Sequence, residues 1–179
     1  MKQLGPTDLK RLHRDWNRRT KGRLALLLDG VQSPYNVGAI VRTAAAYRVD
    51  HLYLGGETLS PAHARVGKLS MGTERYLSWS TFAQSPDAAD AARDDGYTVL
   101  GLELADDAVP LHQLRPGLDV CLAVGHEERG LSAATLAACD SVARLRLLAR
   151  RHGPRRPGKP EQRNHATEAR RRAGAPLID

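Results

Sequence analysis

Short, continuous apolar runs set the strongest limit on what this chain folds into. They occupy residues 24–29, 97–102 and 120–124, and none shows the polar alternation of a strand with one wet face. Segments of helical composition at 37–48 and 87–95 alternate with them. This pattern predicts an α/β fold: a mainly parallel sheet with helices on both faces. The other predicted elements are strands at His51–Leu54, Tyr76–Trp79 and Val142–Leu148 and helices at Lys10–Arg19 and Leu131–Cys139.

The length and composition favour one cytoplasmic domain. A chain of 179 residues holds a single domain with a real core, and with one Phe, two Trp and five Tyr that core is built from Leu, Val and Ala. No apolar run approaches the roughly 20 residues of a membrane span, and no apolar stretch follows the basic N-terminus. Of the two cysteines, Cys121 lies in an apolar run, so we expect core packing and a reducing compartment.

The charge is unevenly distributed along the chain. Residues 1–23 carry eight Lys/Arg and two acidic residues, whereas 24–143 carry eight basic and fifteen acidic residues. Residues 144–179 carry eleven basic and three acidic residues. An acidic body with two basic ends is expected if the ends contact phosphates, although basic tails that merely keep a chain soluble have the same composition.

The first group of candidate site residues follows the strand predicted at 24–29. Ser33 and Asn36 are N-cap candidates for the next helix, and Gly38 allows a close backbone approach. Arg42 follows Gly38 by four residues, on the same side of the helix, and its guanidinium suits a phosphodiester. Taken alone, this pattern is equally typical of an ordinary capped helix that carries an arginine on its surface.

The second group follows the strand predicted at 120–124. Gly125 and Gly130 bracket a short loop suited to a flat ligand, and Glu127 lies between them, where its carboxylate could hold a helix N-terminus or another loop. A plain strand–turn–helix joint would account for these glycines equally well.

Taken together, the two groups resemble a known family. Asn36-x-Gly38-x-x-x-Arg42 after the first strand, paired with Gly125-x-Glu127-x-x-Gly130-Leu131 after a late strand, is similar to two motifs of the SpoU (TrmH-like) RNA ribose 2′-O-methyltransferases. Residues 68–74 (Lys-Leu-Ser-Met-Gly-Thr-Glu) are similar to the family's middle Ser-x-Gly segment. The resemblance covers about residues 24–148.

The resemblance implies a trefoil-knotted SPOUT-type fold, a homodimer, and methyl transfer from S-adenosylmethionine to a ribose 2′-oxygen of tRNA or rRNA. It implies that Arg42 is the catalytic residue, with Asn36 and Glu127 fixing it and the loops. RNA would be bound by the basic ends together with Arg42. The implied cofactor-binding residues come from three loops: Leu102, Glu103, Gly125, Gly130, Leu145 and Leu147.

The C-terminal part departs from the family. Arg146 stands where the family has Pro and Ala149 where it has Gly, and no Ser-Leu-Asn follows at the usual spacing. Only Arg163-Asn164, further along the chain, faintly resembles the Leu-Asn of this motif. We therefore expect a basic arm at 1–23, a methyltransferase domain at 24–148 and a disordered, Pro/Gly/Arg-rich tail at 149–179. A shifted reading frame, a truncated gene or a natural basic tail would each give this composition.

Because of this departure, two functions remain open for the chain. The first is an RNA 2′-O-methyltransferase. The second is a non-catalytic RNA-binding protein on the same scaffold, whose cofactor site is lost with the family's closing helix. Without that helix, the apolar side chains of Leu102, Val124 and Leu145 should be exposed.

Overall fold

The computed structural model describes residues 5, 7–8, 11, 14–15 and 21–145. The predicted tail at 149–179, Leu147 and the segment where a knot would close lie outside the described residues, as does most of the predicted basic helix. Within the described part of the chain, no helix is long and apolar enough to cross a membrane.

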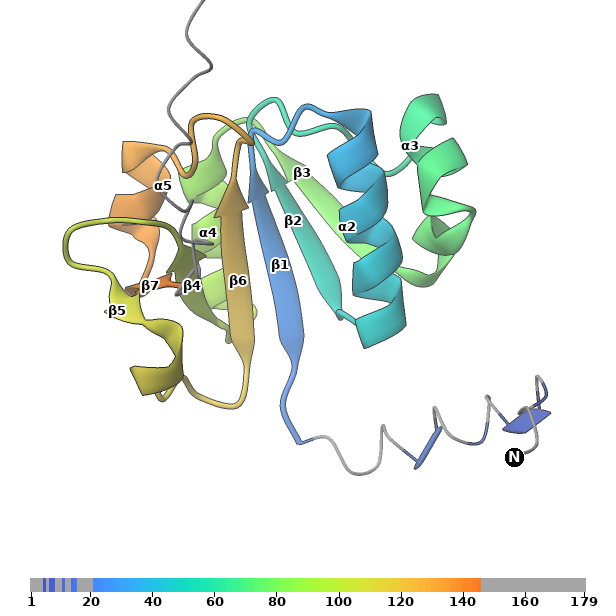
Figure 1. Ribbon diagram of the computed structural model, residues 1–179, viewed down its shortest axis with the longest axis horizontal. Coiled ribbons are helices and arrows are strands. Elements are labelled where there is room, and N and C mark those ends of the chain that lie inside the picture. Colours follow the sequence, from blue (N-terminus) through green and yellow to red (C-terminus); the bar gives the residue numbers. More distant parts are fainter. Residues whose placement is uncertain (1–4, 6, 9–10, 12–13, 16–20, 146–179) are drawn as a thin grey trace, which may run out of the picture. The chain divides into compact units, whose positions relative to one another are not determined.

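One parallel sheet forms the centre of the fold (Figure 1). Its seven strands run in the order β3-β2-β1-β6-β4-β7-β5, and every paired neighbour is parallel. The strands are β1 Leu24–Asp29, β2 His51–Gly55, β3 Ser78–Phe82, β4 Thr98–Leu102, β5 Val109–Pro110, β6 Val120–Gly125 and β7 Ser141–Arg144. The three continuous apolar runs became β1, β4 and β6, adjacent strands buried in the middle of the sheet.

Helices cover both faces of this sheet (Figure 1). On one face lie α2 Pro34–Tyr47, α3 Ala64–Ser70 and the 3-10 turn η1 Thr73–Tyr76; on the other lie α4 Ser85–Asp94 and α5 Ala133–Ala138. A second 3-10 turn, η2 Leu111–Gln113, follows β5. The predicted α/β class and the two helical layers are therefore confirmed.

Two predicted strands were misplaced. Thr73–Tyr76 forms a 3-10 turn, so β3 begins only at Ser78. The last strand, predicted over Val142–Leu148, occupies Ser141–Arg144, and Leu145 has already left it. The helix α3 was not predicted, because Ala64–Ser70 holds only two buried residues, Val66 and Ser70, and so lacks a clear helical apolar period.

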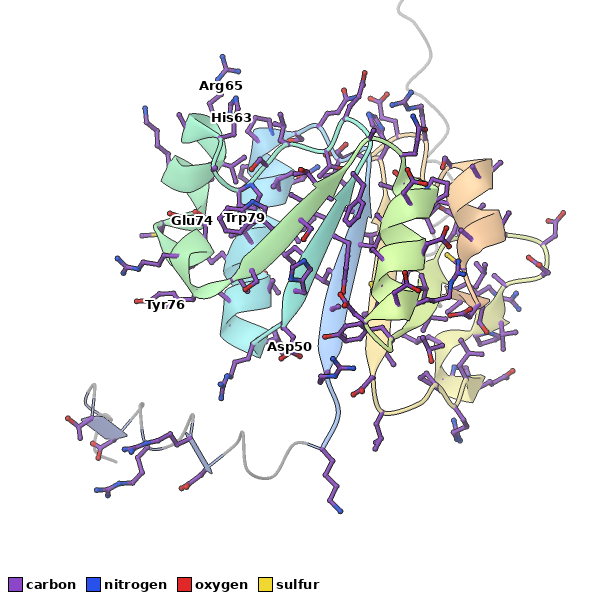
Figure 2. The ribbon with its side chains drawn as sticks, turned by 180° about the vertical axis from the view of Figure 1, so that it is seen from behind. Asp50, His63, Arg65, Glu74, Tyr76 and Trp79 are labelled. Carbon is purple, nitrogen blue, oxygen red and sulfur yellow. The ribbon has the colours of Figure 1, made fainter. Side chains whose placement is uncertain are left out.

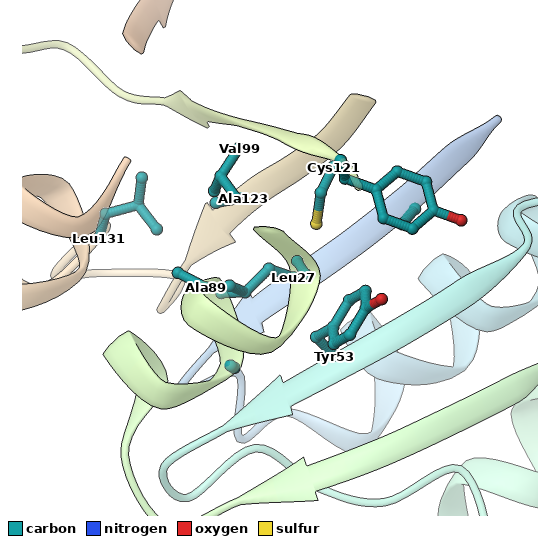
Figure 3. Close-up of a cluster of buried hydrophobic side chains, with 11 residues drawn as sticks. Leu27, Tyr53, Ala89, Val99, Cys121, Ala123 and Leu131 are labelled. Carbon is teal, nitrogen blue, oxygen red and sulfur yellow. The ribbon is translucent and has the colours of Figure 1, made fainter. Parts of the chain in front are cut away.

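The core has two parts, one on each side of the sheet. The part under α4 and α5 packs Leu27, Val99 and Leu131 with several alanines around Tyr53 (Figure 3). The part under α2 and α3 is built from leucines and valines, among them Leu28, which is fully buried. Burying one such leucine contributes roughly 1.5–3 kcal/mol. The expected Leu/Val/Ala core is confirmed, with Tyr53 and Tyr97 as its buried aromatic members.

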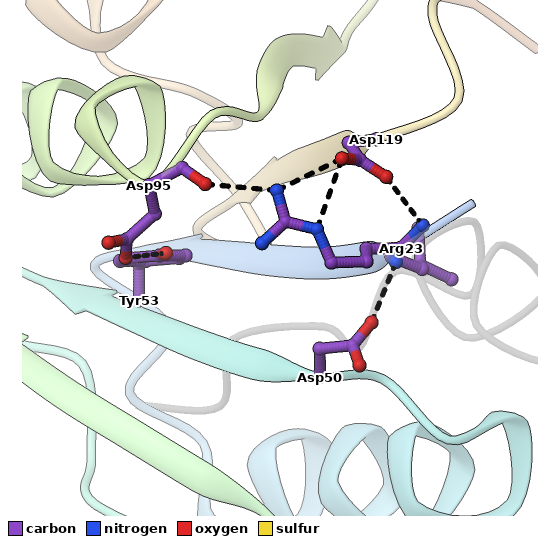
Figure 4. Close-up of polar contacts among 6 residues, drawn as sticks. Arg23, Asp50, Tyr53, Asp95 and Asp119 are labelled. Atoms are coloured by element: carbon purple, nitrogen blue, oxygen red, sulfur yellow. Dashed lines mark hydrogen bonds and ion pairs between the residues drawn. The ribbon is translucent and has the colours of Figure 1, made fainter. Parts of the chain in front are cut away.

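The amino ends of the strands are joined by a polar cluster around Arg23 (Figure 4). The Arg23 backbone N–H and guanidinium donate to Asp119, at 2.8 and 3.0 Å, just before β6. The same guanidinium lies 4.4 Å from the ring centroid of Tyr97, and Asp50, before β2, accepts from the Leu24 N–H at 3.0 Å. These contacts align β1 with its neighbours at the edge of the sheet where the strands begin.

Gly38 and Gly67 allow a matched test of helix packing. A Cβ on Gly38, in α2, would lie 2.5 Å from the Leu69 Cβ, whereas a Cβ on Gly67, in α3, would meet nothing within 4 Å. We predict that Gly38→Ala lowers the free energy of unfolding by about 1–3 kcal/mol, because α2 and α3 must separate. Gly67→Ala should raise it by up to ~1 kcal/mol, because alanine favours the helix.

Urea denaturation of the full chain measures both changes. Equal stabilisation by the two substitutions would contradict the close α2–α3 packing.

Candidate active site at the carboxyl edge of the sheet

The two sequence motifs meet where β1 and β6 end. The strands are parallel neighbours in register, with Asp29 opposite Gly125, so the loops that follow them leave the same edge of the sheet. One loop leads into α2 and the other, residues 125–132, leads into α5. This is the edge at which open α/β sheets bind ligands.

Glu127 joins the two motifs directly. Its Oε1 accepts from Asn36 Nδ2 at 2.8 Å and from the Ser33 backbone N–H at 3.2 Å. Its side chain is 26% exposed. Partial burial raises the pKa of Glu127, but hydrogen bonds from its own backbone, Asn36 and Ser33 outweigh this effect, and the pKa lies below its ordinary value. Glu127 therefore contacts the first turn of α2, which is one of the two contacts expected for it.

Ser33 is the N-cap of α2. Its Oγ accepts from the Asn36 N–H at 3.4 Å, and Pro34 begins the helix. Asn36 therefore lies within the first turn rather than at the cap. Its amide is consequently available to reach across to Glu127.

Arg42 lies further along α2, with its side chain exposed. Its Nη1 contacts the Met71 Sδ at 3.2 Å, between α3 and η1. Glu127 and Asn36 thus hold the loops, while Met71 supports Arg42. In the described part of the chain no hydrogen bond joins Glu127 or Asn36 to Arg42, so their expected role in fixing Arg42 stays a prediction. Met71 was not predicted, since nothing local in the sequence links it to α2.

Gly38 has a different role from the one predicted. It is buried against Leu69 of α3, so its backbone faces protein and not a ligand. Helical spacing alone does not say which side of α2 packs on a neighbouring helix. The close approach that Gly38 allows is therefore made by α3 and not by a ligand.

The loop 125–132 closes tightly on itself. A Cβ on Gly125 would lie 2.0 Å from the Gly130 carbonyl carbon, so no side chain fits there. Gly130 has φ +68°, and a Cβ on it would lie 2.1 Å from Glu103 Oε2. Both glycines are therefore required by the backbone of the loop.

The structure brings Leu102, Glu103, Gly125 and Gly130 together, at the ends of β4 and β6. Glu103, just after β4, accepts from the Leu131 N–H at 2.9 Å and lies beside Gly130. Leu102 is half-buried at the end of β4 and pairs with Ala143 of β7. Leu145 follows β7 and is 52% exposed, as predicted, whereas Leu102 and Val124, which were also predicted to be exposed, are half-buried.

These residues fit an adenosine-type cofactor. Half-buried Leu102 and exposed Leu145 offer apolar contact for a flat ring. The Glu103 carboxylate accepts from two backbone N–H groups, those of Leu104 and Leu131. A carboxylate has about four acceptor positions, so capacity remains for ribose hydroxyls.

Asp29 is a further residue at this edge of the sheet, and the sequence predicted no role for it. It is 8% exposed at the end of β1, accepts from the Ser132 N–H at 2.8 Å and binds the Ser85 hydroxyl. Burial raises its pKa, but the hydrogen bonds from Ser85 and Ser132 outweigh this, and the pKa lies below the ordinary value. Asp29 thereby ties the beginnings of α4 and α5 to the sheet. The Asp-Gly step that closes the strand was the only signal in the sequence.

This architecture defines an α/β protein with a ligand-binding edge assembled from the loops after β1, β4 and β6. Residues 23–150 match the model of the SpoU rRNA Methylase family, and the chain belongs to that family.

Known proteins of similar sequence and structure include RNA methyltransferases of this family. A TrmH-family protein of Staphylococcus saprophyticus, classed as a tRNA/rRNA methyltransferase, is 27% identical over 69% of this chain and 49% of its own length. An AdoMet-bound rRNA methyltransferase from Sinorhizobium meliloti is 27% identical with a TM-score of 0.66, over 74% of this chain and 51% of that one. An RNA 2′-O ribose methyltransferase is 25% identical with a TM-score of 0.59, over 69% of this chain and 47% of that one. The chain thus spans about half the length of the relatives it matches.

The buried carboxylate predicts a particular pH dependence of stability. Because the pKa of Asp29 is lowered on folding, its contribution is present at neutral pH and is lost as pH falls below about 4. We predict that Asp29→Asn lowers the free energy of unfolding by about 1–3 kcal/mol at pH 7 and by less at pH 3.

Urea unfolding at both pH values measures this difference. Asp106→Asn, at an exposed loop position, is the control and should change stability by less than about 0.5 kcal/mol. A loss at Asp29 that is the same at pH 7 and pH 3 would contradict the assignment.

Proposed function

We propose that this chain transfers a methyl group from S-adenosylmethionine to a ribose 2′-oxygen of tRNA or rRNA. The observation that carries the proposal is the contact of Glu127 with Asn36 and Ser33, which joins the two family motifs at one edge of the sheet. The 2′-O-methyltransferase among the structural neighbours supports the position of the methyl group. The two basic ends of the chain and Arg42 would contact the RNA phosphates.

Arg42 is proposed as the catalytic residue. A ribose hydroxyl is a weak nucleophile, so its developing oxyanion must be stabilised while the reacting atoms are aligned. A guanidinium stays protonated near neutral pH, which disfavours a role as general base. Arg42 is exposed and supported by Met71, and it would clamp the phosphate beside the target ribose and stabilise the oxyanion.

Leu102, Glu103, Gly125, Gly130, Leu145 and Leu147 are proposed to hold the cofactor; Leu147 lies outside the described residues. S-adenosylmethionine supplies the electrophilic methyl group when bound. The carboxylate of Glu103 would accept from ribose hydroxyls, and the rigid 125–130 loop would lie along the cofactor without moving during the reaction.

We also propose a homodimer. An apolar hollow of about 340 Å³ lies between β1, β6 and the exposed side of α2, where a second copy would find apolar contact. It is lined by Leu24, Leu26, Ala39, Ile40, Thr43, Ala44, Tyr47, Val49 and Val124. Sedimentation equilibrium of the full chain measures the oligomeric state, and a monomer at all concentrations would refute the proposal.

Substitution of Arg42 tests the catalytic assignment. Arg42→Ala should lower methyl transfer by at least about 10²-fold, because one charge-stabilising group is lost, while thermal stability stays unchanged. Arg42→Lys should also fail, since a single ammonium cannot reproduce the planar fork. Transfer of a labelled methyl group to total RNA measures activity, and calorimetry measures cofactor binding.

Two outcomes would count against the proposal. Near-normal turnover by the lysine variant would show that a positive charge alone suffices. A wild-type chain that binds RNA but not S-adenosylmethionine would favour the non-catalytic RNA-binding alternative.

Glu127 is proposed as a positioning residue, and its neighbour Glu128 provides a matched control. Glu127→Ala should lower the turnover number about tenfold or more, because the two loops lose their contact. Glu127→Gln should recover part of this loss, because its Oε1 still accepts from Asn36 and Ser33. Glu128→Ala, at an exposed position, should keep wild-type turnover. Equal losses at 127 and 128, or no rescue by glutamine, would contradict this role.

A further inference from the structure

The fold separates the charges of the acidic body into two helical layers. In the layer of α2, α3 and η1, residues 34–48 and 63–76 carry five Lys/Arg and a single acidic residue. On the opposite face, residues 85–95, which contain α4, carry four aspartates and one arginine. One side of the sheet therefore presents a basic surface, although the body as a whole is acidic.

Four of the five basic residues of this layer lie at exposed positions. Arg42, Arg65, Lys68 and Arg75 are all exposed. The one acidic residue, Glu74, accepts a hydrogen bond from the Ser70 hydroxyl within the same layer, which lowers its pKa. Figure 2 shows Arg65 at one end of this layer and Tyr76 at the other, with Glu74 between them.

Exposed flat and polarisable side chains lie among these charges. Tyr76 is 70% exposed, and the Arg75 guanidinium lies 4.9 Å from its ring centroid. Met71 is 68% exposed and contacts Arg42. Two exposed arginines of this layer are thus each in contact with an exposed tyrosine or methionine side chain.

We propose that α3 and η1 form a binding surface for single-stranded RNA, continuous with Arg42. Arg65, Lys68 and Arg75 would contact successive phosphates, and a base would stack on Tyr76, whose ring is already paired with a guanidinium. A duplex hides the faces of its bases, so the exposed tyrosine favours an unpaired strand. The strand would flank the ribose placed at Arg42.

This inference rests on the proposed function only in taking RNA as the ligand. Its test measures RNA binding without cofactor and without methyl transfer. The proposed function and the proposed RNA-binding surface can therefore fail separately. A chain that binds RNA through α3 and η1 but transfers no methyl group overturns the proposed function alone. A chain that transfers methyl groups to RNA but binds the oligonucleotide equally well without these side chains overturns the surface alone.

The experiment measures binding of a fluorescent 12-nucleotide oligouridylate to the full chain at several salt concentrations. Each phosphate contact on a single strand contributes about 0.7 to the slope of log affinity against log salt. The double variant Arg65→Ala/Lys68→Ala should therefore reduce the slope by about 1.4. The basic ends are present in every protein compared, so the difference isolates α3.

Matched variants separate stacking and location from net charge. Tyr76→Ala should weaken binding about tenfold, whereas Tyr76→Phe should retain it. Leu118→Ala removes an apolar side chain of similar exposure, 71%, just before β6 and should have no effect. Arg115→Ala, which removes an exposed charge from the loop before β6, should leave the slope within about 0.2 of wild type.

Three results would overturn the proposal. The first is an unchanged slope in the Arg65/Lys68 double variant. The second is a reduction by Arg115→Ala of about 0.7, which would show that net charge matters and location does not. The third is a 12-base-pair RNA duplex bound as tightly as the single strand, with Tyr76→Ala equal to wild type, which would exclude stacking.

Discussion

The loop at residues 125–132 is held by three carboxylates, and the candidate site depends on it. Glu103 binds the Leu131 N–H, Asp29 binds the Ser132 N–H, and Glu127, from the loop itself, binds Asn36 and the Ser33 N–H. Each carboxylate accepts from backbone or amide N–H groups, which are strong, directional partners for a negative charge. The ends of β1, β4 and β6 and the start of α2 are thereby tied to one short segment.

This arrangement separates a rigid part of the site from an accessible one. There is no room for a side chain at Gly125 or at Gly130, so the backbone of the loop packs closely on itself and on Glu103 at these two positions. Arg42, by contrast, is exposed and rests on a flexible thioether. A rigid loop suits a bound cofactor, and an exposed guanidinium suits a large substrate that approaches from outside. The Arg23 cluster, at the other end of the strands, fixes their alignment without using any of these residues.

Much of the fold could be predicted because strands buried on both faces need continuous apolar sequence, which β1, β4 and β6 have. The pairing of the two motifs could be predicted because parallel strands bring their following loops to one edge. Contacts between helices could not. Gly38 packs on α3 rather than facing a ligand, and Met71 supports Arg42 from 29 residues away. The basic layer was hidden by the net acidity of the body, since charge counted along the chain does not show which face of the sheet it reaches.

The central claim is that this chain methylates a ribose 2′-oxygen. Alkaline hydrolysis of RNA requires a free 2′-hydroxyl, so a methyl group at that oxygen protects the adjacent phosphodiester bond. The most direct measurement is therefore alkaline digestion of RNA labelled by the full chain with radioactive S-adenosylmethionine, followed by separation of the products. The account predicts that the label is recovered in alkali-resistant dinucleotides. Label recovered in mononucleotides, as methylation of a base would give, would contradict it.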